Sequence, residues 1–210
     1  MIGRIEYLNL LPFHLFIKKN FSHYTTKTSY PSKINQLFKT NSINAAFISS
    51  IKSKNKKCLD AGIIANKKVL SVLVCEGKIK DDIESNTSNI LAKILHQNGE
   101  ILIGDKALKR YHNNNINCKD LATLWYQKHN LPFVFARFCI NNQNSKYKKM
   151  IDKFLSSKTK IPQYILKKYA LKHSLSKTQI KEYLDLITYK ITHKEKKSLK
   201  KFLKLANKIS

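Results

Sequence analysis

Residues 3–12 read Gly-Arg-Ile-Glu-Tyr-Leu-Asn-Leu-Leu-Pro, and the organisation of the chain follows from this run. Its first half predicts a short buried strand, because apolar side chains dominate at Ile2, Ile5, Tyr7 and Leu8. Pro12 then fits only the first turn of a helix, since proline has no N–H to donate and its φ is already helical. That helix continues through Phe13, Leu15, Phe16 and Ile17. Asn9 therefore lies where the chain switches from strand to helix.

The position of Asn9 has two interpretations. In open α/β sheets, ligands bind beyond the carboxyl ends of the strands, where an asparagine can offer its amide to a ligand. The same side chain can instead cap the following helix, and the local pattern by itself favours the cap. Both interpretations place Asn9 at the edge of a sheet.

The 210-residue chain is long enough for one large domain or two small ones. Its residues are 42% hydrophobic and include 10 Phe and 10 Tyr, so it can bury a substantial core despite a net charge of +27. No apolar run reaches the length of a transmembrane helix, which predicts no membrane insertion. Residues 1–20 lack the basic region and the cleavage site of a signal peptide, and we therefore expect a cytoplasmic protein.

The charge is strongly basic, with 40 Lys and Arg against 13 Asp and Glu, a balance often seen in nucleic-acid-binding proteins. Only three of the basic residues are Arg, however: Arg4, Arg110 and Arg137. Arginine is the residue preferred for bidentate recognition of bases and phosphates. We therefore interpret the charge as a compositional bias and expect no specific nucleic-acid partner. A positive field still attracts a small dianion.

Neither metal ligation nor a bound cofactor is indicated. The cysteines lie far apart with no C-x-x-C pair, which predicts reduced, buried thiols rather than a zinc site or disulfides, at Cys58, Cys75, Cys118 and Cys139. The seven histidines lack metal-ligand spacing, and each is expected on the surface or on a helix face. The five glycines form no phosphate-binding loop.

The first two thirds of the chain alternate between strand and helix patterns. Strands are expected at residues 23–30, 44–51, 63–65, 69–75, 101–103 and 132–140, and helices at residues 32–38, 85–95, 106–111 and 120–129. The early strand–helix–strand order predicts a parallel sheet with right-handed crossovers. After Asn141 the pattern changes to four helices with no further strand, and the last two begin with capping boxes at Ser176 and Thr192.

Polar side chains collect at the predicted strand ends in two parts of the chain. The first part contributes Asn9, Ser49 and Ser50, and the second contributes Ser85, Asn86, Thr87, Ser88 and Asp105. The run at residues 85–88 begins a helix, where free N–H groups and the helix dipole can bind an anion. The hydroxyls there can also cap the helix, and the local pattern alone favours capping.

Apolar strands at residues 69–75 and 132–140 separate these two polar groups and can connect two lobes. This layout is typical of an α/β, two-lobed, periplasmic-binding-protein-like (type II) fold, with a ligand cleft between the lobes and a helical C-terminal segment. We place lobe 1 at residues 1–70 plus 142–210 and lobe 2 at residues 71–141. Such a cleft serves either binding or catalysis, and the fold does not decide between them.

The opening pattern Gly-Arg-Ile-x-Tyr-Leu-Asn-x-x-Pro resembles the chorismate dehydratases of the futalosine route to menaquinone. Five further blocks are similar to that family and follow in the family's order, at residues 44–50, 69–73, 85–88, 103–108 and 120–136. In the first of these, Asn44 replaces the family's usual acid and Ser49 replaces its proline. Together the blocks span most of residues 3–137.

The resemblance implies a carbon–oxygen lyase that removes water from chorismate to give 3-[(1-carboxyvinyl)oxy]benzoate, with neither cofactor nor metal. On this reading Asn9 is the catalytic residue, which hydrogen-bonds the substrate near the departing hydroxyl. A substrate carboxylate binds at the helix start, at Ser85, Asn86, Thr87 and Ser88. Ser49 or Ser50 contacts the substrate from the other lobe. No general base is evident.

Three other functions stay open. A dihydroxynaphthoate synthase-like enzyme of the same pathway would share the architecture, although the Tyr-Leu-Asn opening fits the dehydratase better. A solute-binding protein would hold a small anion without chemistry, and the missing signal peptide argues against it. A basic nucleic-acid-binding protein is disfavoured by the scarcity of arginine. The oligomeric state is not predicted.

Overall fold

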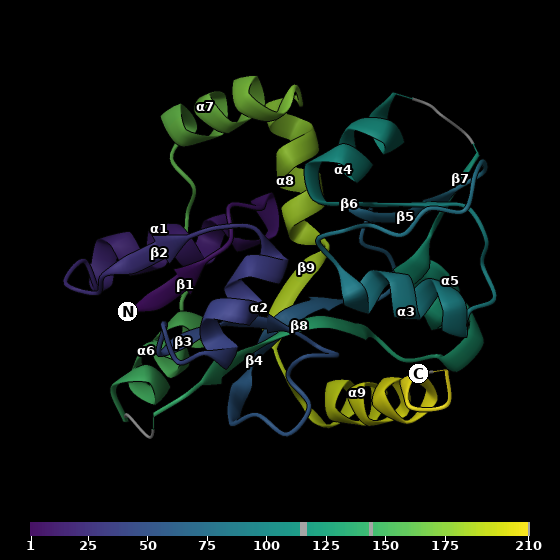
Figure 1. The fold of residues 1–210 in the computed structure, drawn as a ribbon. Helices are drawn as coiled ribbons and strands as arrows, with labels where there is room; N and C mark the ends of the chain where they lie inside the picture. Colours follow the sequence, from purple (N-terminus) through teal and green to yellow (C-terminus); the bar gives the residue numbers. More distant parts are fainter. Residues whose placement is uncertain (114–116, 143–144, 210) are drawn as a thin grey trace.

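The computed structural model describes residues 1–113, 117–142 and 145–209. Within them the chain forms two β-sheets surrounded by helices (Figure 1). The strands are β1 Ile2–Arg4, β2 Thr26–Thr28, β3 Ala45–Ser49, β4 Cys58–Ala65, β5 Val72–Cys75, β6 Glu100–Ile103, β7 Cys118–Asp120, β8 Phe133–Ile140 and β9 Ile187–Lys190. The helices are α1 Leu11–Asn20, α2 Pro31–Lys39, α3 Asn86–Ile94, α4 Gly104–His112, α5 Leu121–His129, α6 Ser145–Ser156, α7 Gln163–His173, α8 Lys177–Asp185 and α9 His193–Ala206, with a short 3-10 helix η1 at Leu8–Leu10.

The larger sheet has six strands in the order β2-β1-β3-β8-β4-β9. β1 pairs in parallel with β2 and with β3, which confirms the parallel arrangement expected for the first part of the chain. β8 runs antiparallel between β3 and β4, and β9 pairs antiparallel with the outer edge of β4. The sheet is therefore mixed, because only its first three strands are joined by helical crossovers.

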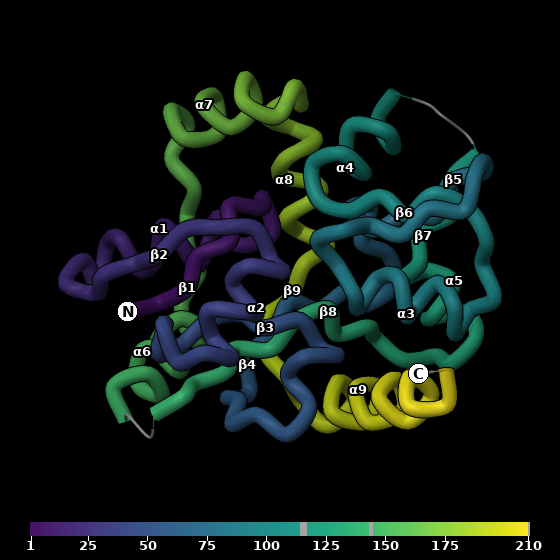
Figure 2. Tube along the Cα trace, viewed as in Figure 1, coloured from purple at the N-terminus to yellow at the C-terminus, as the bar shows by residue number. Residues whose placement is uncertain are grey.

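The smaller sheet has three strands in the order β6-β5-β7, and both pairings are antiparallel. In Figure 1 its teal strands lie between α4 on one side and α3 and α5 on the other. Figure 2 follows the chain from the purple N-terminal strands into this teal lobe and back through the green β8. The two-lobed layout expected from the sequence is present.

The return from the smaller lobe comes earlier than the boundary at residue 141 that we expected. β8 begins at Phe133 and pairs along its length with strands of the larger sheet, so residues 133–140 lie in that sheet and not in the smaller lobe. The apolar character of β8 has a physical reason. A strand between two others, covered by helices, buries both of its faces.

The C-terminal segment contains the four expected helices, and both predicted capping boxes form, at Ser176 with Gln179 and at Thr192 with Glu195. The prediction of no further strand after Asn141 is wrong, because β9 follows α8 directly. Ile187 continues the helical spacing of apolar residues in α8. The pattern therefore predicted helix at this position and not a strand. Pairing with β4 then stabilises an extended conformation that the local pattern does not indicate.

The prediction of reduced thiols is also wrong. Cys58 on β4 is bonded to Cys139 on β8, and Cys75 on β5 is bonded to Cys118 on β7. Each pair stands directly opposite across two antiparallel strands, at sequence separations of 81 and 43 residues. Strand register decides which cysteines meet, and register cannot be read from spacing along the chain.

Aromatic side chains fill the space where α9 covers the sheet. Trp125 of α5 is fully buried, and its ring lies edge-to-face against Phe133 at 5.3 Å and Phe202 at 6.3 Å. Its indole N–H donates to the hydroxyl of Ser198 on α9 at 3.0 Å. This cluster therefore joins the smaller lobe to the last helix. None of the helices in the described ranges is both long and apolar enough to span a bilayer.

Candidate active site

A pocket lies between the two lobes and is lined by side chains from both. Its polar lining comes from Tyr7, Asn9 and Ser49 of the larger lobe and from Ser71, Glu84, Ser85 and Ser88 on the side of the smaller lobe. Apolar side chains such as Phe47, Val72 and Phe135 complete the wall. An apolar cleft with a few convergent polar groups is the usual form of a small-molecule site.

Asn9 lies on η1, in the turn between β1 and α1. No side chain caps α1, so the interpretation of Asn9 as a helix cap is wrong. Its Oδ1 is buried and has no hydrogen-bond partner within residues 1–113, 117–142 and 145–209. Its backbone carbonyl accepts a hydrogen bond from the Tyr189 hydroxyl at 2.5 Å, which holds the turn in place. An unsatisfied buried carbonyl oxygen costs about 1–3 kcal/mol, so a ligand that donates a hydrogen bond to this amide oxygen would be stabilised.

Beside Asn9, a buried pair extends the polar wall of the cleft. The Tyr183 hydroxyl of α8 donates to the Ser71 hydroxyl at 2.9 Å. Burial raises the pKa of Tyr183, while its hydrogen bonds with the Ser71 and Asn9 side chains lower the pKa by less. The phenol is therefore a stable neutral donor. Neither residue was predicted as part of the site, because Ser71 lies within an apolar run and Tyr183 on an apolar helix face.

The start of α3 both caps the helix and faces the cleft. The Ser85 hydroxyl accepts from the Ser88 backbone N–H at 3.2 Å, and the two hydroxyls are 2.8 Å apart. Both residues line the cleft. Capping is thus confirmed for Ser85. The Ser88 hydroxyl is not needed for the cap and can rotate toward a bound anion.

Asn86 and Thr87 point elsewhere. Asn86 lines a separate surface pocket beside Lys52 and Lys56. The Thr87 hydroxyl is buried and accepts from the Ile51 backbone N–H at 3.2 Å, which ties α3 to the loop after β3. These two residues therefore do not line the cleft between the lobes.

Ser49 is the last residue of β3 and Ser50 follows it, and the two side chains have different surroundings. Ser49 lines the cleft and is held by Asn35 of α2, whose amide donates to its hydroxyl at 3.1 Å and accepts from its backbone N–H at 3.1 Å. Ser50 is fully buried, and its hydroxyl donates to the Val134 carbonyl at 2.5 Å. Of the two serines, Ser49 is the one available to a ligand.

One hydrogen bond crosses the mouth of the cleft. The Tyr7 hydroxyl of the larger lobe donates to a carboxylate oxygen of Glu84. Gly104 permits this approach, since its φ is +58° and a Cβ there would stand 3.1 Å from the Tyr7 ring. Sequence analysis missed the pair, because Tyr7 matched the apolar pattern of the first strand and Glu84 lay in a polar loop.

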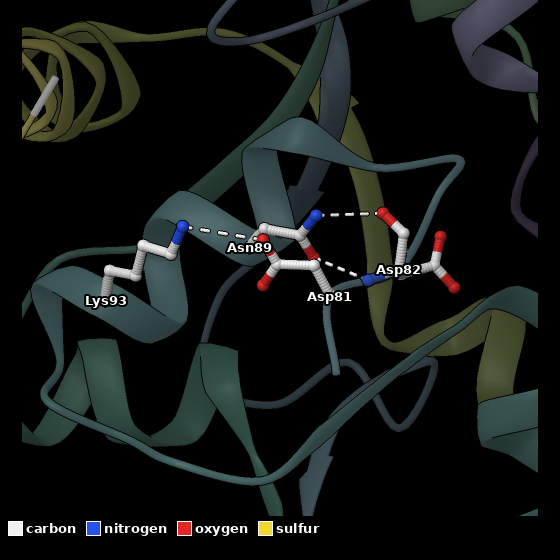
Figure 3. A network of polar contacts seen from close by, with 4 residues as sticks. All are labelled: Asp81, Asp82, Asn89 and Lys93. Carbon is white, nitrogen blue, oxygen red and sulfur yellow. Dashed lines mark hydrogen bonds and ion pairs between the residues drawn. The ribbon is translucent and has the colours of Figure 1, made fainter. Parts of the chain in front are cut away.

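Figure 3 shows how the loop before α3 is held. The Asn89 side chain accepts from the Asp82 backbone N–H at 2.9 Å and donates to the Asp82 carbonyl at 2.8 Å. Lys93 forms an ion pair with Asp81 at 3.4 Å. The Asp82 carboxylate in turn accepts from the Glu84 backbone N–H at 2.8 Å. These contacts fix Glu84 at the entrance to the cleft.

A second contact joins the lobes at the same entrance. Nδ1 of His173, at the end of α7, lies 2.8 Å from the Asp105 carboxylate at the start of α4. His173 lies on a helix, as expected, but on a buried face. In the described parts of the chain, no group of three or more His, Cys, Asp or Glu side chains is placed to hold a metal ion.

Comparison with known proteins now identifies the family. A family model described as menaquinone biosynthesis matches residues 82–208, more than half of the chain. The chain belongs to the menaquinone biosynthesis family. It is similar to a chorismate dehydratase of Campylobacter jejuni, at 45% identity over 97% of this chain and 96% of that protein. It is also similar to a chorismate dehydratase of Thermus thermophilus, at 24% identity over 72% and 73% of the two chains.

Solved structures confirm the fold of this menaquinone biosynthesis family member. A protein of Archaeoglobus fulgidus matches with a TM-score of 0.67 at 12% identity, over 99% of this chain and 96% of that one. The periplasmic aliphatic sulphonate binding protein of Escherichia coli matches with a TM-score of 0.54 at 14% identity, over 99% and 91%. At such identities the likeness concerns the fold alone, and it confirms the periplasmic-binding-protein-like architecture.

Three tyrosines around the cleft of this family member predict a loss of stability in alkali. Burial raises the pKa values of Tyr7, Tyr183 and Tyr189 above the usual value of about 10. A raised folded-state pKa contributes stability that is complete below about pH 10 and is lost as the pH rises further, because the unfolded chain releases the proton first. We expect each such tyrosine to cost up to about 1.4 kcal/mol of unfolding free energy per pH unit above about pH 10.

The measurement is the unfolding free energy between pH 8 and pH 11.5, for the wild type and for Tyr183→Phe. Lysine deprotonation affects both proteins equally, so the difference between them isolates one tyrosine. The wild type should lose its advantage over the variant as the pH rises. A difference that stays constant up to pH 11.5 would show that Tyr183 ionises as easily in the folded protein as in the unfolded chain.

Proposed function

We propose that this protein is a chorismate dehydratase, a hydro-lyase that converts chorismate to 3-[(1-carboxyvinyl)oxy]benzoate and water on the futalosine route to menaquinone. The observation that carries the proposal is the buried, unpartnered amide oxygen of Asn9 in a cleft whose opposite wall is the hydroxyl-rich start of α3. The 45% identity to the Campylobacter jejuni chorismate dehydratase supports it.

The reaction makes limited demands on the protein. One ring carbon loses its hydroxyl group and the neighbouring ring carbon loses a proton, so that a new double bond completes an aromatic ring. Aromatisation drives the elimination forward. The cleft must therefore hold two carboxylates, orient the ring and stabilise the departing hydroxyl in the transition state.

Asn9 is proposed as the residue at the departing hydroxyl. Its Nδ2 can donate to the leaving oxygen, and its free Oδ1 can accept from the hydroxyl of the bound substrate. An amide cannot act as a base, so its contribution is electrostatic stabilisation in a site from which water is largely excluded. The neutral phenol of Tyr183 faces the Asn9 side chain and supports its orientation.

Ser85 and Ser88 are proposed to bind one substrate carboxylate together with the backbone N–H groups at the start of α3. Ser49 is proposed to contact the substrate from the larger lobe. Ser50, Asn86 and Thr87 are assigned supporting roles, since Ser50 and Thr87 already have partners within the protein. The high positive charge favours the arrival of a dicarboxylate. Cytoplasmic location and the lack of a specific nucleic-acid partner stay predictions.

The first experiment is an assay of the purified protein with chorismate. We expect the diene absorbance to decline with time and the product to weigh one water less than the substrate. Tight binding without turnover would instead favour a protein that holds a small anion. The proposal would be contradicted if chorismate were neither bound nor converted. A product other than the aromatic enol ether would point to a related enzyme of the pathway.

Replacing Ser88 by Ala tests the carboxylate site. We expect the KM for chorismate to rise roughly tenfold, because one hydrogen bond to a charged group is lost, while kcat stays within about twofold. Ser85 keeps the helix cap in this variant, so the fold is preserved. Steady-state kinetics give both constants, and Ser156→Ala, on the exposed end of α6, is the matched control. An unchanged KM would remove Ser88 from the binding site.

A further inference from the structure

A second cavity, with a volume of about 320 Å³, lies away from the cleft. Its walls come from β1, β2, α1 and α7, and it shares none of its described lining residues with the cleft. In Figure 1, α7 lies above α1 and β2. Its residues Ile165, Lys168 and Tyr169 belong to the lining of the cavity. The volume is at the lower end of the range found for small-molecule sites.

The polar lining of this cavity is basic. Arg4, His14, Lys18 and Lys168 line it, and none of its described lining residues is acidic. The Nε of Arg4 is buried and has no hydrogen-bond partner among the residues that the structure describes. The carboxylate paired with Arg4 is that of Glu6, which is half-exposed and 3.8 Å from Nη2. A guanidinium N–H is a costly group to bury without an acceptor, so the arrangement favours an anion.

His14 supplies a donor without adding charge. It lies on α1 one turn before Lys18, so both side chains lie on the same side of the helix. Burial and, secondarily, the charge of Arg4 lower the pKa of His14 to about 3. The imidazole is therefore neutral near pH 7, and it can accept or donate one hydrogen bond beside the guanidinium.

The remaining walls are aromatic and apolar. Phe13, Phe21, Tyr24 and Tyr169 surround the cavity together with Leu11 and Ile165. A simple inorganic anion would leave this surface without contact, whereas a planar apolar body would cover it. We propose that this cavity is a second binding site for a small aromatic carboxylate, whose charged group is held by Arg4 and whose ring packs among the aromatic side chains.

The test uses benzoate as the probe and the three arginines of the chain as reporters. In ¹⁵N-labelled protein each arginine contributes one Nε–Hε signal, and the signal absent from Arg4→Lys belongs to Arg4. Benzoate is expected to shift the Arg4 signal saturably and to leave the signal of Arg110, on the exposed side of α4, in place. This signal reports the cavity separately from any benzoate in the cleft.

Isothermal titration calorimetry on variants measures the affinity for benzoate. Arg4→Met should weaken benzoate binding at this site roughly tenfold, and Lys168→Met roughly threefold. Lys181→Met, on an exposed position of α8, should have no effect. Lys168 is exposed, so its variant keeps the test valid if Arg4→Met does not fold. An Arg4 signal that benzoate does not move would overturn the proposal. Equal shifts with sulfate, or with uncharged benzyl alcohol, would overturn the ligand class.

Discussion

Replacing Asn9 by Ala is expected to lower kcat for chorismate dehydration by about 100- to 1,000-fold, with a much smaller change in KM. The reason is the position of the amide, which is buried in the cleft, free of protein partners at Oδ1 and not engaged as a helix cap. The Nδ2 group of this amide is the donor that can stabilise the negative charge that develops only as the hydroxyl departs. Steady-state rates of product formation, followed by mass, measure the effect.

The matched control for this variant is Asn66→Ala, because Asn66 is exposed in the loop after β4. It should turn over chorismate at the wild-type rate. Asn9→Ala should also unfold close to the wild-type temperature, since its Oδ1 has no partner among the described residues and its backbone keeps the hydrogen bond from Tyr189. A rate within twofold of the wild type would place Asn9 outside the reaction and would leave the carboxylate site as the main support for the proposed function.

Replacing Trp125 by Ala is expected to lower the free energy of unfolding by about 3–5 kcal/mol. Trp125 is fully buried, so truncation leaves a large cavity between α5 and α9. The edge contacts with Phe133 and Phe202 disappear with the ring. The Ser198 hydroxyl also loses its indole donor and remains buried. All three interactions belong to the aromatic cluster that joins the smaller lobe to α9, so the variant weakens that connection.

Denaturant titration of the variant measures this effect. Tyr164→Ala is the control, since Tyr164 is an aromatic residue of α7 that is 72% exposed, and its change should stay within about 0.5 kcal/mol. Trp125→Phe is an intermediate case, because it retains a six-membered ring and removes the indole N–H together with the five-membered ring. A loss below about 1 kcal/mol for Trp125→Ala would mean that the surrounding side chains collapse into the cavity.

Local chemistry explains why so many elements of the fold were predicted correctly. Pro12 and Pro31 sit in the first turns of α1 and α2, and Ser85, Ser176 and Thr192 precede the helices that they were expected to start. These signals act within three or four residues, so they work in the same way in any tertiary context. β9 carried no such signal, and only its pairing with β4 made it a strand.

The candidate site was predicted in outline and corrected in detail. Ser49 and Ser50 were predicted together at a strand end, but only Ser49 lines the cleft, whereas the Ser50 hydroxyl is turned to the Val134 carbonyl. Tyr7 and Glu84 were missed because they are 77 residues apart, and nothing in either segment indicates the other. Whether the Asn9 amide caps a helix or stays free depended on the conformation of η1, which a local pattern leaves open.

The sequence by itself determined the alternation of strands and helices, the two-lobed architecture, the family, and the positions of Asn9 and Ser85 at the ends of elements. These properties arise from periodicity, caps and motifs within short windows. Only the tertiary structure decided the disulfide pairs, the mixed sheet, the Tyr7–Glu84 contact and the hydrogen bond from Tyr189 to Asn9, which spans 180 residues. Each of these depends on which distant segment folding brings into contact, and strand register and lobe packing set that choice.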